Sequence, residues 1–400
     1  MHDILIFGGG FAGMWAALSA AREIGLHGAG QSVALVSRDP YLTIRPRLYE
    51  RSPRDLRTPL RPVLEHAGVS LLQGEAIRLD ALNSRAVVQS ADAVETIVPY
   101  KRLVLATGSK ASMPPIPGLE EFAWSIDDFG SAVRFDGQLA DLLKNRPPQN
   151  PLTIAIIGGG FTGIELACEM RDRIAVHAGE AAAQSARVFL FEKAVDIGPD
   201  LGPGPRPQIE QALKEARVEV HTGVDIARLK PDSLEFADGS EVPVDACVLT
   251  AGLAANVPPG LESHQRDALG RLLTDGDLRV SGAPAIFAAG DCAVGQVDDE
   301  HLSLMSCQHA MPMGRFAGHN AAHDLLGRAT RTYSQPFYQT CLDLGRSGAV
   351  LTHGWEREVR KSGAEAGALK RNINTLWIYP PSGSRDEIFK VADIDYKPVR

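Results

Sequence analysis

Glycines at a fixed spacing occur twice in the chain, and the chemistry they suit is the binding of diphosphates. The segment Gly8-Gly9-Gly10-Phe11-Ala12-Gly13 reappears as Gly158-Gly159-Gly160-Phe161-Thr162-Gly163. In such a turn the first glycine permits a tight bend, the second lets the backbone approach a diphosphate, and the third lets a helix pack on a strand. The phosphates then lie at a helix N-terminus, where free N–H groups attract negative charge. One copy is a weak indication, but two copies in matching context predict two dinucleotide sites.

Each glycine turn should be followed by a second strand that ends in a side chain for the ribose hydroxyls. After the second turn, the apolar run 188–191 ends at Glu192, whose carboxylate would repel a 2′-phosphate. NADH is therefore favoured over NADPH at this turn, although Lys193 keeps NADPH open. After the first turn, the run 33–36 ends at Ser37 and Arg38, so a carboxylate is missing and Ser37 is the available ribose ligand.

The elements around these turns predict an α/β fold with parallel sheets. Apolar runs precede both turns, at 4–7 and 154–157, and segments rich in Ala, Leu and Glu follow them, at 14–23 and 164–173. These patterns are typical of buried parallel strands and helices. The uncharged stretch 4–21 also has the hydropathy of a signal peptide or membrane span, but its glycines and the absence of a basic leader favour a strand and a helix. Two more strands, at 103–105 and 285–289, run into small-residue turns, and a helix is expected after the second.

Composition limits the function to small-molecule chemistry in a reducing compartment. The chain has 400 residues, of which 44% are hydrophobic, enough for two or three cores. A net charge of -8 argues against a nucleic-acid partner. Five widely spaced cysteines without a CxxC motif indicate a reducing environment, so a cytoplasmic location is predicted. No metal site is predicted.

With these motifs the chain resembles the flavoproteins with two dinucleotide-binding domains, and among them most the type II NADH dehydrogenases (NADH:quinone oxidoreductases). The resemblance covers residues 3–330 and includes both glycine turns, Ala106-Thr107-Gly108, Thr250-Ala251-Gly252 and Gly290-Asp291. It implies two Rossmann-like domains, with the NAD(P)H-binding domain (113–254) inserted in the FAD-binding domain (1–112 and 255–330). A small C-terminal α+β cap or interface region (331–400) would follow.

The resemblance also implies a set of cofactor-contacting residues, with FAD at the first turn and NADH at the second. The expected set is Gly8, Gly10, Phe11, Ala12, Gly13, Ser37, Arg38, Arg45, Ala106, Thr107, Gly108, Gly290, Asp291, Gly158, Gly160, Phe161, Thr162, Gly163, Glu192 and Gly252. The carboxylate of Asp291 would bond the ribityl or pyrophosphate region of the flavin; as a simpler alternative it caps a helix.

Three further residues are catalytic candidates on the same resemblance: Arg47, Glu165 and Gln308. Arg47, or Arg45 beside it, could stabilise negative charge that develops on reduced flavin, and a solvated basic loop is the alternative. Glu165 could order the hydride donor or relay a proton, and the alternative is an acid favoured by the helix dipole. Gln308 matches the family's quinone-side helix, but Cys307 and Met313 replace the Ala and Gln that this helix usually carries, so a quinone acceptor is left open. The alternative is that this helix is an ordinary part of the core.

The predicted function is that of an FAD-dependent oxidoreductase, which passes hydride from NADH to flavin and electrons on to a quinone or another small-molecule acceptor. The first alternative is a tailoring flavoenzyme acting on a specialised aromatic or quinone-like metabolite. A sulfide:quinone reductase, suggested by Cys341 but without a second thiol at the expected place, and a non-turnover redox sensor are less favoured.

The segment 369–377 has the apolar spacing of a short helix beside basic residues. Type II dehydrogenases attach to membranes near the C-terminus, so this segment is where the resemblance would place a membrane contact. Because the stretch is short and only moderately apolar, packing in a core or a homodimer interface is favoured over association with a membrane surface.

Overall fold

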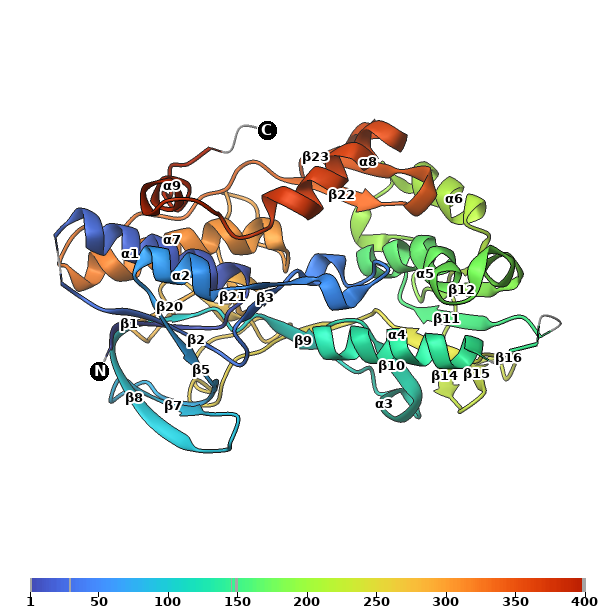
Figure 1. Ribbon diagram of the computed structural model, residues 1–400, viewed down its shortest axis with the longest axis horizontal. Coiled ribbons are helices and arrows are strands. Elements are labelled where there is room, and N and C mark those ends of the chain that lie inside the picture. Colours follow the sequence, from blue (N-terminus) through green and yellow to red (C-terminus); the bar gives the residue numbers. More distant parts are fainter. Residues whose placement is uncertain (1, 29, 145, 148–149, 398–400) are drawn as a thin grey trace.

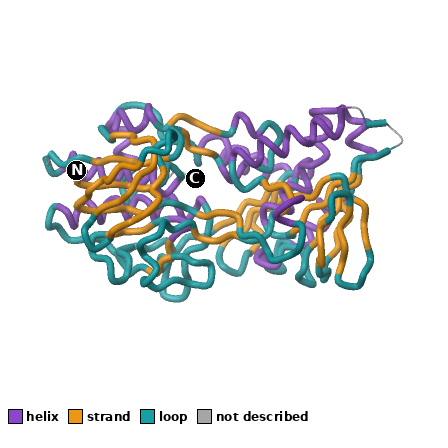
Figure 2. The backbone as a smooth tube through the Cα atoms, turned by 90° about the horizontal axis from the view of Figure 1, so that it is seen from below, coloured by secondary structure: helices purple, strands orange, loops and turns teal. Residues whose placement is uncertain are grey.

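The computed structural model describes residues 2–28, 30–144, 146–147 and 150–397. Two sheets with their own helices lie at opposite ends of an elongated molecule (Figures 1 and 2). Both sheets are built around parallel strands, and they confirm the predicted α/β class.

The first sheet has seven strands in the order β5-β2-β1-β8-β7-β6, with β20 paired to β8. The run 4–7 that precedes the first glycine turn is fully buried in the central strand, which explains why its apolar residues are continuous rather than alternating. Helices α1, α2 and α7 pack with this sheet in one core. The bounds are β1 His2–Phe7, β2 Val33–Ser37, β5 Ser70–Gln73, β6 Glu75–Asp80, β7 Arg85–Gln89, β8 Glu95–Leu105, β20 Ile286–Ala288, α1 Phe11–Leu26, α2 Arg61–Ala67 and α7 Cys307–Leu325.

The second sheet has five parallel strands in the order β10-β17-β11-β12-β13. Alternate residues of its central strands face two different cores: one is shared with helices α4, α5 and α6, and the other with the small antiparallel sheet β14-β15-β16. The bounds are β10 Ala123–Ser125, β11 Thr153–Ile157, β12 Arg187–Phe191, β13 Val218–His221, β14 Ile226–Leu229, β15 Ser233–Phe236, β16 Glu241–Pro243, β17 Ala246–Leu249, α4 Phe129–Lys144, α5 Phe161–Ser185 and α6 Arg206–Glu215.

The chain passes from the first sheet to the second and back through one two-stranded ribbon. Strand β9 (Ser109–Ala111) leaves the first sheet, and β18 (Leu253–Ala255) returns beside it in antiparallel pairing. Short elements complete these two parts: β3 Tyr41–Thr43 pairs with β4 Arg57–Pro59, β19 Leu272–Leu273 pairs with β21 Ala293–Val294, and α3 spans Leu119–Phe122.

The C-terminal part lies across both sheets. An antiparallel sheet of β22 (Gln339–Asp343), β23 (Ala349–His353) and β24 (Glu358–Ser362), with helix α8 (Gly363–Asn372), lies above α5, and α9 (Arg385–Val391) returns to α1 and α2 (Figure 1). The segment predicted as a helix continues from α8 into a π-helical turn, Ile373–Trp377. Only its first half is packed, because Leu376 is 65% exposed and Trp377 is 38% exposed.

Two sequence expectations are settled by these elements. The charge-free stretch 4–21 forms β1 and α1, and among the described helices we find none with the length and apolar character needed to cross a membrane. The helix expected directly after Asp291 is wrong: Gly290–Cys292 forms a single 3-10 turn, and α7 begins only at Cys307. The reason is that Ala293 and Val294 are drawn into parallel pairing with β19.

Candidate active site

Three of the four glycines of the first turn, Gly8, Gly10 and Gly13, have three different environments. Gly8 has φ +109°, and a Cβ there would lie 2.1 Å from the Ala106 carbonyl oxygen. A Cβ on Gly13 would lie 1.8 Å from the Gly8 oxygen, so strand and helix touch at this point. A Cβ on Gly10 would meet no described atom within 4 Å, and Gly10 begins α1 without a side-chain cap. No side chain therefore caps the first N–H groups of α1, which leaves them available to a diphosphate.

The second turn repeats this arrangement. Gly158 has φ +107° and its Cβ would lie 2.8 Å from the Ala251 Cβ, while a Cβ on Gly163 would lie 1.8 Å from the Gly158 oxygen. Gly160 is again open and caps α5 without a side chain. The packed outer glycines and the open middle glycine correspond to the three roles that a dinucleotide-binding turn needs.

The residues predicted to meet the two riboses lie beside the turns. A Cβ on Gly9 would lie 2.3 Å from the Ser37 Oγ, and the Glu192 carboxylate accepts hydrogen bonds from the N–H groups of Gly159 (2.7 Å) and Ala194 (2.8 Å). Two N–H donors hold this carboxylate in place at the second turn. The ammonium of Lys193 pairs with Asp225 at 3.1 Å, and both side chains are well exposed.

Arg45, Ser109 and Asp291 form a polar cluster where β9 meets the Gly290–Cys292 turn. The Ser109 hydroxyl donates to Asp291 Oδ2 at 2.6 Å, and Arg45 Nη1 donates to the Ser109 oxygen at 2.9 Å and lies 3.8 Å from the same carboxylate. Arg45 is also ion-paired with Asp127. Burial raises the pKa of Asp291, while the Ser109 hydrogen bond and the Arg45 charge oppose that rise. The cluster offers an acceptor, a hydroxyl and a cation at one place.

The remaining glycine turns shape the backbone around this cluster. Gly108 has φ +71° and open space at its Cβ position, and Gly252 has φ +82° with its Cβ position only 2.7 Å from the Ser112 oxygen. Thr107 binds the backbone carbonyl of Asn256 through its hydroxyl, so the outgoing and returning crossings are tied together. The turns are flanked by five more of the predicted residues: Phe11, Ala12, Arg38, Phe161 and Thr162. Of these, Arg38 and Thr162 are exposed, and Ala12 is buried.

Arg47 is directed away from this cluster. Its guanidinium makes two hydrogen bonds to Glu50, at 2.8 and 2.6 Å, and a third to the Tyr379 hydroxyl at 3.0 Å. These bonds to Glu50 raise the pKa of Arg47 and neutralise its charge locally. The structure therefore brings Arg45, but not Arg47, into the cluster with Asp291.

Glu165 forms a buried ion pair that sequence analysis did not find. The residue is 3% exposed, and its Oε1 accepts hydrogen bonds from Lys370 Nζ at 2.7 Å and from the Asp343 N–H at 3.0 Å. Lys370 also donates to the Cys341 carbonyl at 2.8 Å. Burial raises the pKa of Glu165 to about 7, and the Lys370 charge limits that rise. Burial would lower the pKa of Lys370, but Glu165 raises it.

The pair belongs to a network that joins three parts of the chain. The Tyr49 hydroxyl donates to Asp343 Oδ2 at 2.9 Å, and burial raises the pKa of Tyr49. The Lys370 ammonium lies 5.5 Å from the Phe161 ring centroid, beside the second glycine turn. Tyr49 from the segment after β3, Phe161 at the start of α5 and Lys370 of helix α8 thus lie at one site.

The structure ties down the side chain of Gln308. With its amide oriented to satisfy both partners, it accepts from the Gln339 N–H at 3.1 Å and donates to the Gln339 carbonyl, and so it is held against β22. Met313 is fully buried in the core of the first sheet. Burial raises the pKa of Cys307 to about 11, and that of Cys341 also to about 11. Both are therefore thiols at neutral pH.

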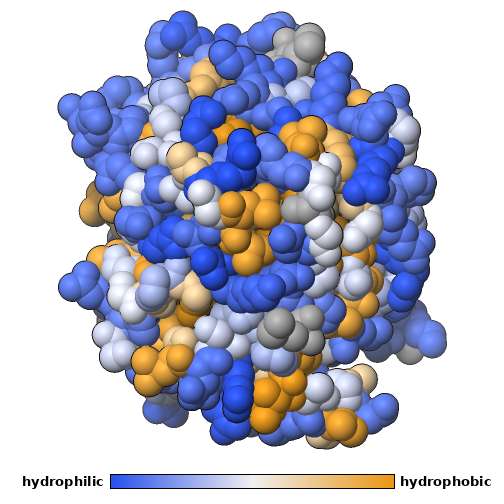
Figure 3. All heavy atoms as spheres, turned by 90° about the vertical axis from the view of Figure 1, so that its left-hand side faces the viewer, coloured by the Kyte–Doolittle hydropathy of each residue, from blue (hydrophilic) through white to orange (hydrophobic). Residues whose placement is uncertain are grey.

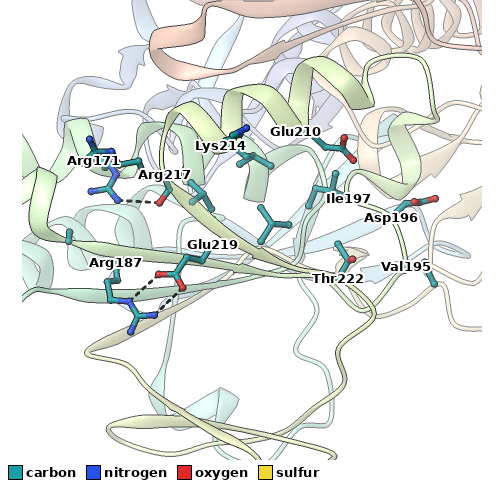
Figure 4. A pocket seen from close by; sticks show the side chains of 14 residues that line it. Arg171, Arg187, Val195, Asp196, Ile197, Glu210, Lys214, Arg217, Glu219 and Thr222 are labelled. Atoms are coloured by element: carbon teal, nitrogen blue, oxygen red, sulfur yellow. Dashed lines mark hydrogen bonds and ion pairs between the residues drawn. The ribbon is translucent and has the colours of Figure 1, made fainter.

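A groove among the described residues lies elsewhere. It has a volume of about 650 Å³ and runs beside the edge strand β13 and α6, lined by basic and acidic side chains (Figure 4). Arg187 and Glu219, on the neighbouring strands β12 and β13, are ion-paired at its edge at 3.0 Å. It contains neither glycine turn and no predicted cofactor residue, so the candidate active site is the junction described above.

Comparisons with known proteins show the family of the chain. The family model of the pyridine nucleotide-disulphide oxidoreductases matches residues 2–314. A Mycobacterium tuberculosis protein named NADH dehydrogenase-like protein is 41% identical over 98% of both chains. A demethylphylloquinone reductase from Synechocystis is 25% identical over 94% of this chain and 92% of that protein.

Solved structures share the fold. The structure of NDH2 from Plasmodium falciparum in complex with NADH superposes with a TM-score of 0.79 at 15% identity, covering 97% of each chain. The sulfide:quinone oxidoreductase from Aquifex aeolicus gives a TM-score of 0.75 at 18% identity, covering 94% of this chain and 91% of that one. Together with the family match, these findings confirm the resemblance to type II NADH dehydrogenases that the motifs indicated.

Proposed function

Since the chain belongs to the pyridine nucleotide-disulphide oxidoreductase family, we propose that it is an NADH dehydrogenase with FAD at the Gly8–Gly13 turn and NADH at the Gly158–Gly163 turn. Membership of the family confirms that the chain is an oxidoreductase enzyme with FAD and a nicotinamide nucleotide as cofactors. The observation that carries the assignment of sites is the pair of uncapped helix N-termini, each opened by a glycine without a neighbour at its Cβ position.

The residues present fit an FAD at the first turn. We assign it to the domain 1–112 and 255–330, with 113–254 as the NADH-binding domain and 331–400 as the C-terminal cap. When bound, FAD accepts hydride from NADH and passes the electrons to a second substrate. Asp291 and Ser109 supply polar contacts beside it, and Arg45 supplies the positive charge that favours electron-rich states nearby.

The second turn favours NADH over NADPH. Glu192 is held by two backbone N–H groups, so its negative charge cannot move away from a 2′-phosphate. Lys193, which could have offset that charge, is paired with Asp225.

Glu165 is the residue we assign to proton transfer. A carboxyl with a pKa of about 7 is present in both protonation states at neutral pH, which is the property a proton relay needs. Lys370 and the Asp343 N–H are positioning groups, because they fix the carboxylate oxygen without reaching the reacting atoms themselves. Reduction of a quinone to a hydroquinone takes up protons, and Glu165 would supply one of them.

The acceptor we propose is a quinone. The support is the similarity to the Synechocystis demethylphylloquinone reductase and to type II NADH:quinone oxidoreductases, one of them from Mycobacterium tuberculosis at 26% identity. Cys307 and Met313 replace residues that the family's quinone-side helix usually carries, so a specialised quinone-like molecule is the second candidate.

An anaerobic titration tests the proposal. The purified protein should carry FAD, lose its visible flavin absorbance on addition of NADH, respond much more weakly to NADPH, and regain the absorbance on addition of a short-chain quinone. A protein that takes up no FAD would refute the assignment of the first turn. Reduction by NADH without reoxidation by any simple quinone would refute the quinone and favour the specialised acceptor.

A further inference from the structure

Helices α1 and α7 lie side by side with their backbones in contact. A Cβ on Gly314 would lie 2.2 Å from the Ala12 oxygen, and one on Gly318 would lie 2.1 Å from the Ala16 oxygen. Because the contact advances along both helices in the same direction, the helices are parallel and their C-terminal ends meet, at the left of Figure 1. The negative ends of two helix dipoles therefore converge at one place, which favours a cation there.

Three histidines and a glutamate gather at this end. His323 Nε2 lies 2.9 Å from Glu23 Oε2, and His27 Nε2 lies 3.7 Å from the same oxygen. The ligand atoms of Glu23, His27 and His323 all lie within 4.8 Å of one another. His319, one turn before His323 on α7, stacks on it with ring centroids 3.9 Å apart and has its Nδ1 3.3 Å from Glu23 Oε1. Arg22 is ion-paired with Glu23 Oε1, so Oε2 is the oxygen that faces His27 and His323.

The hydrogen bonds of His323 fix which nitrogen faces the carboxylate. Its Nδ1 lies 2.7 Å from the Ala329 carbonyl oxygen, which can only accept, so Nδ1 carries the proton. In a neutral ring, Nε2 then presents its lone pair to the Glu23 carboxylate. Two acceptors at 2.9 Å need a positive species between them, either a second proton or a metal ion. In a metal-binding histidine, the ring nitrogen that does not bind the metal usually donates its proton to an acceptor such as a backbone carbonyl.

His319 provides an independent indication. Its side chain is buried, with the residue 6% exposed; Nδ1 lies 3.3 Å from Glu23 Oε1 without forming a well-aligned hydrogen bond, and Nε2 has no hydrogen-bond partner among the described residues. Buried polar groups without partners are rare and destabilising.

We propose that Glu23, His27 and His323 form a transition-metal site of the Zn²⁺ class, with a water as the fourth ligand. Imidazole nitrogen with one carboxylate oxygen is the donor set of Zn²⁺, whereas Ca²⁺ and Mg²⁺ prefer oxygen ligands throughout. The ion would join the ends of α1 and α7. The exposed His27 gives it access from solvent, on a face of the molecule that is mostly hydrophilic (Figure 3).

The role of this site is structural rather than catalytic. Helix α1 has 16 residues, so at 1.5 Å per residue the cluster lies about 24 Å from the Gly10 turn at the other end of the helix. The ion would hold the helix whose N-terminus forms the first diphosphate site. This inference does not depend on the identity of the electron acceptor.

Metal binding to the purified protein without an affinity tag tests the site. After removal of metals with a chelator, a calorimetric titration with Zn²⁺ alone should show one equivalent bound, and Zn²⁺ should raise the Tm. Co²⁺ as a probe should give the visible absorption bands of a tetrahedral site. The His27→Ala and Glu23→Gln variants should bind Zn²⁺ at least about tenfold more weakly, since removing a ligand costs more than disturbing an outer partner.

His66→Ala is the matched control. His66 is exposed on α2 and bonded to the Pro62 carbonyl of its own helix, so its loss should leave the Zn²⁺ affinity unchanged. Since His27 is exposed at the end of its helix, His27→Ala should fold even if changes at the buried His319 or Glu23 do not. Absence of stoichiometric Zn²⁺ binding would overturn the proposal and assign the charge between His323 and Glu23 to a proton. Unchanged Zn²⁺ affinity in His27→Ala would overturn it as well.

Discussion

Lys370→Met removes the cation from the buried pair at the candidate active site. The side chains of Lys370 and Glu165 are 8% and 4% exposed, so water cannot replace the lost ammonium. The change leaves the Glu165 carboxylate without its 2.7 Å partner and the Cys341 carbonyl without its donor. Breaking a buried pair by removing one partner typically costs about 3–5 kcal/mol. We expect a loss of that size in the free energy of unfolding above neutral pH.

The loss should depend on pH in a defined direction. The pKa of Glu165 in the folded protein is about 7, above its ordinary value of 4.5, so the folded state binds the proton more tightly than the unfolded chain. The tighter binding of this proton by the folded protein therefore adds to the free energy of unfolding below pH 4.5, and this stabilisation is lost as the pH rises through 7. Lys370 lowers the pKa of Glu165, so without it this pKa rises further. The penalty of Lys370→Met should be small where Glu165 is protonated and should grow as the pH rises.

Urea unfolding at about pH 6 and about pH 8.5 measures this dependence. The control is Lys361→Met, which breaks the exposed pair between Lys361 and Glu365 and should cost only about 0.3–0.5 kcal/mol at either pH. The double variant Glu165→Gln with Lys370→Met should recover part of the stability, because no unpaired charge is then buried. A loss below about 1 kcal/mol, or an equal loss at both pH values, would refute the reasoning.

Other predictions concern the cofactor sites and proton transfer. Gly160→Ala should leave stability unchanged, since its Cβ meets no described atom. In steady-state kinetics the same change should raise the KM for NADH about tenfold or more, and the protein should keep its FAD. Glu192→Gln should reduce the preference for NADH over NADPH by at least about tenfold in kcat/KM; an unchanged ratio would mean that this carboxylate does not face the 2′ position. In stopped-flow measurements, acceptor reduction should fall about tenfold per pH unit above about pH 7, and Glu165→Gln should be slow with no such inflection.

Main-chain geometry was predictable from the sequence because glycine encodes it directly. The open Gly10 and the packed Gly8 and Gly13 follow from a local pattern, and the same pattern is found at the second turn. The helices begin where the turns end but extend further than expected, to Leu26 and to Ser185, beyond the residues whose apolar pattern indicated them. The break within α5 at Gly179, which has φ +80°, also had a local cause that could have been found.

The side-chain partners could not be predicted in the same way, because they are set by tertiary contacts. Arg45 and Arg47 look equivalent in sequence, yet one turn of 3-10 helix sends the first to Ser109 and the second to Glu50 and Tyr379. The partner of Glu165 is 205 positions away along the chain. A glycine motif therefore locates where a nucleotide diphosphate can bind, whereas the pKa of Glu165 is set by tertiary contacts: burial raises it to about 7, and Lys370 of the C-terminal helix α8 limits that rise. For this reason the chemistry at the second turn should be more sensitive to changes in α8 than any local pattern would suggest.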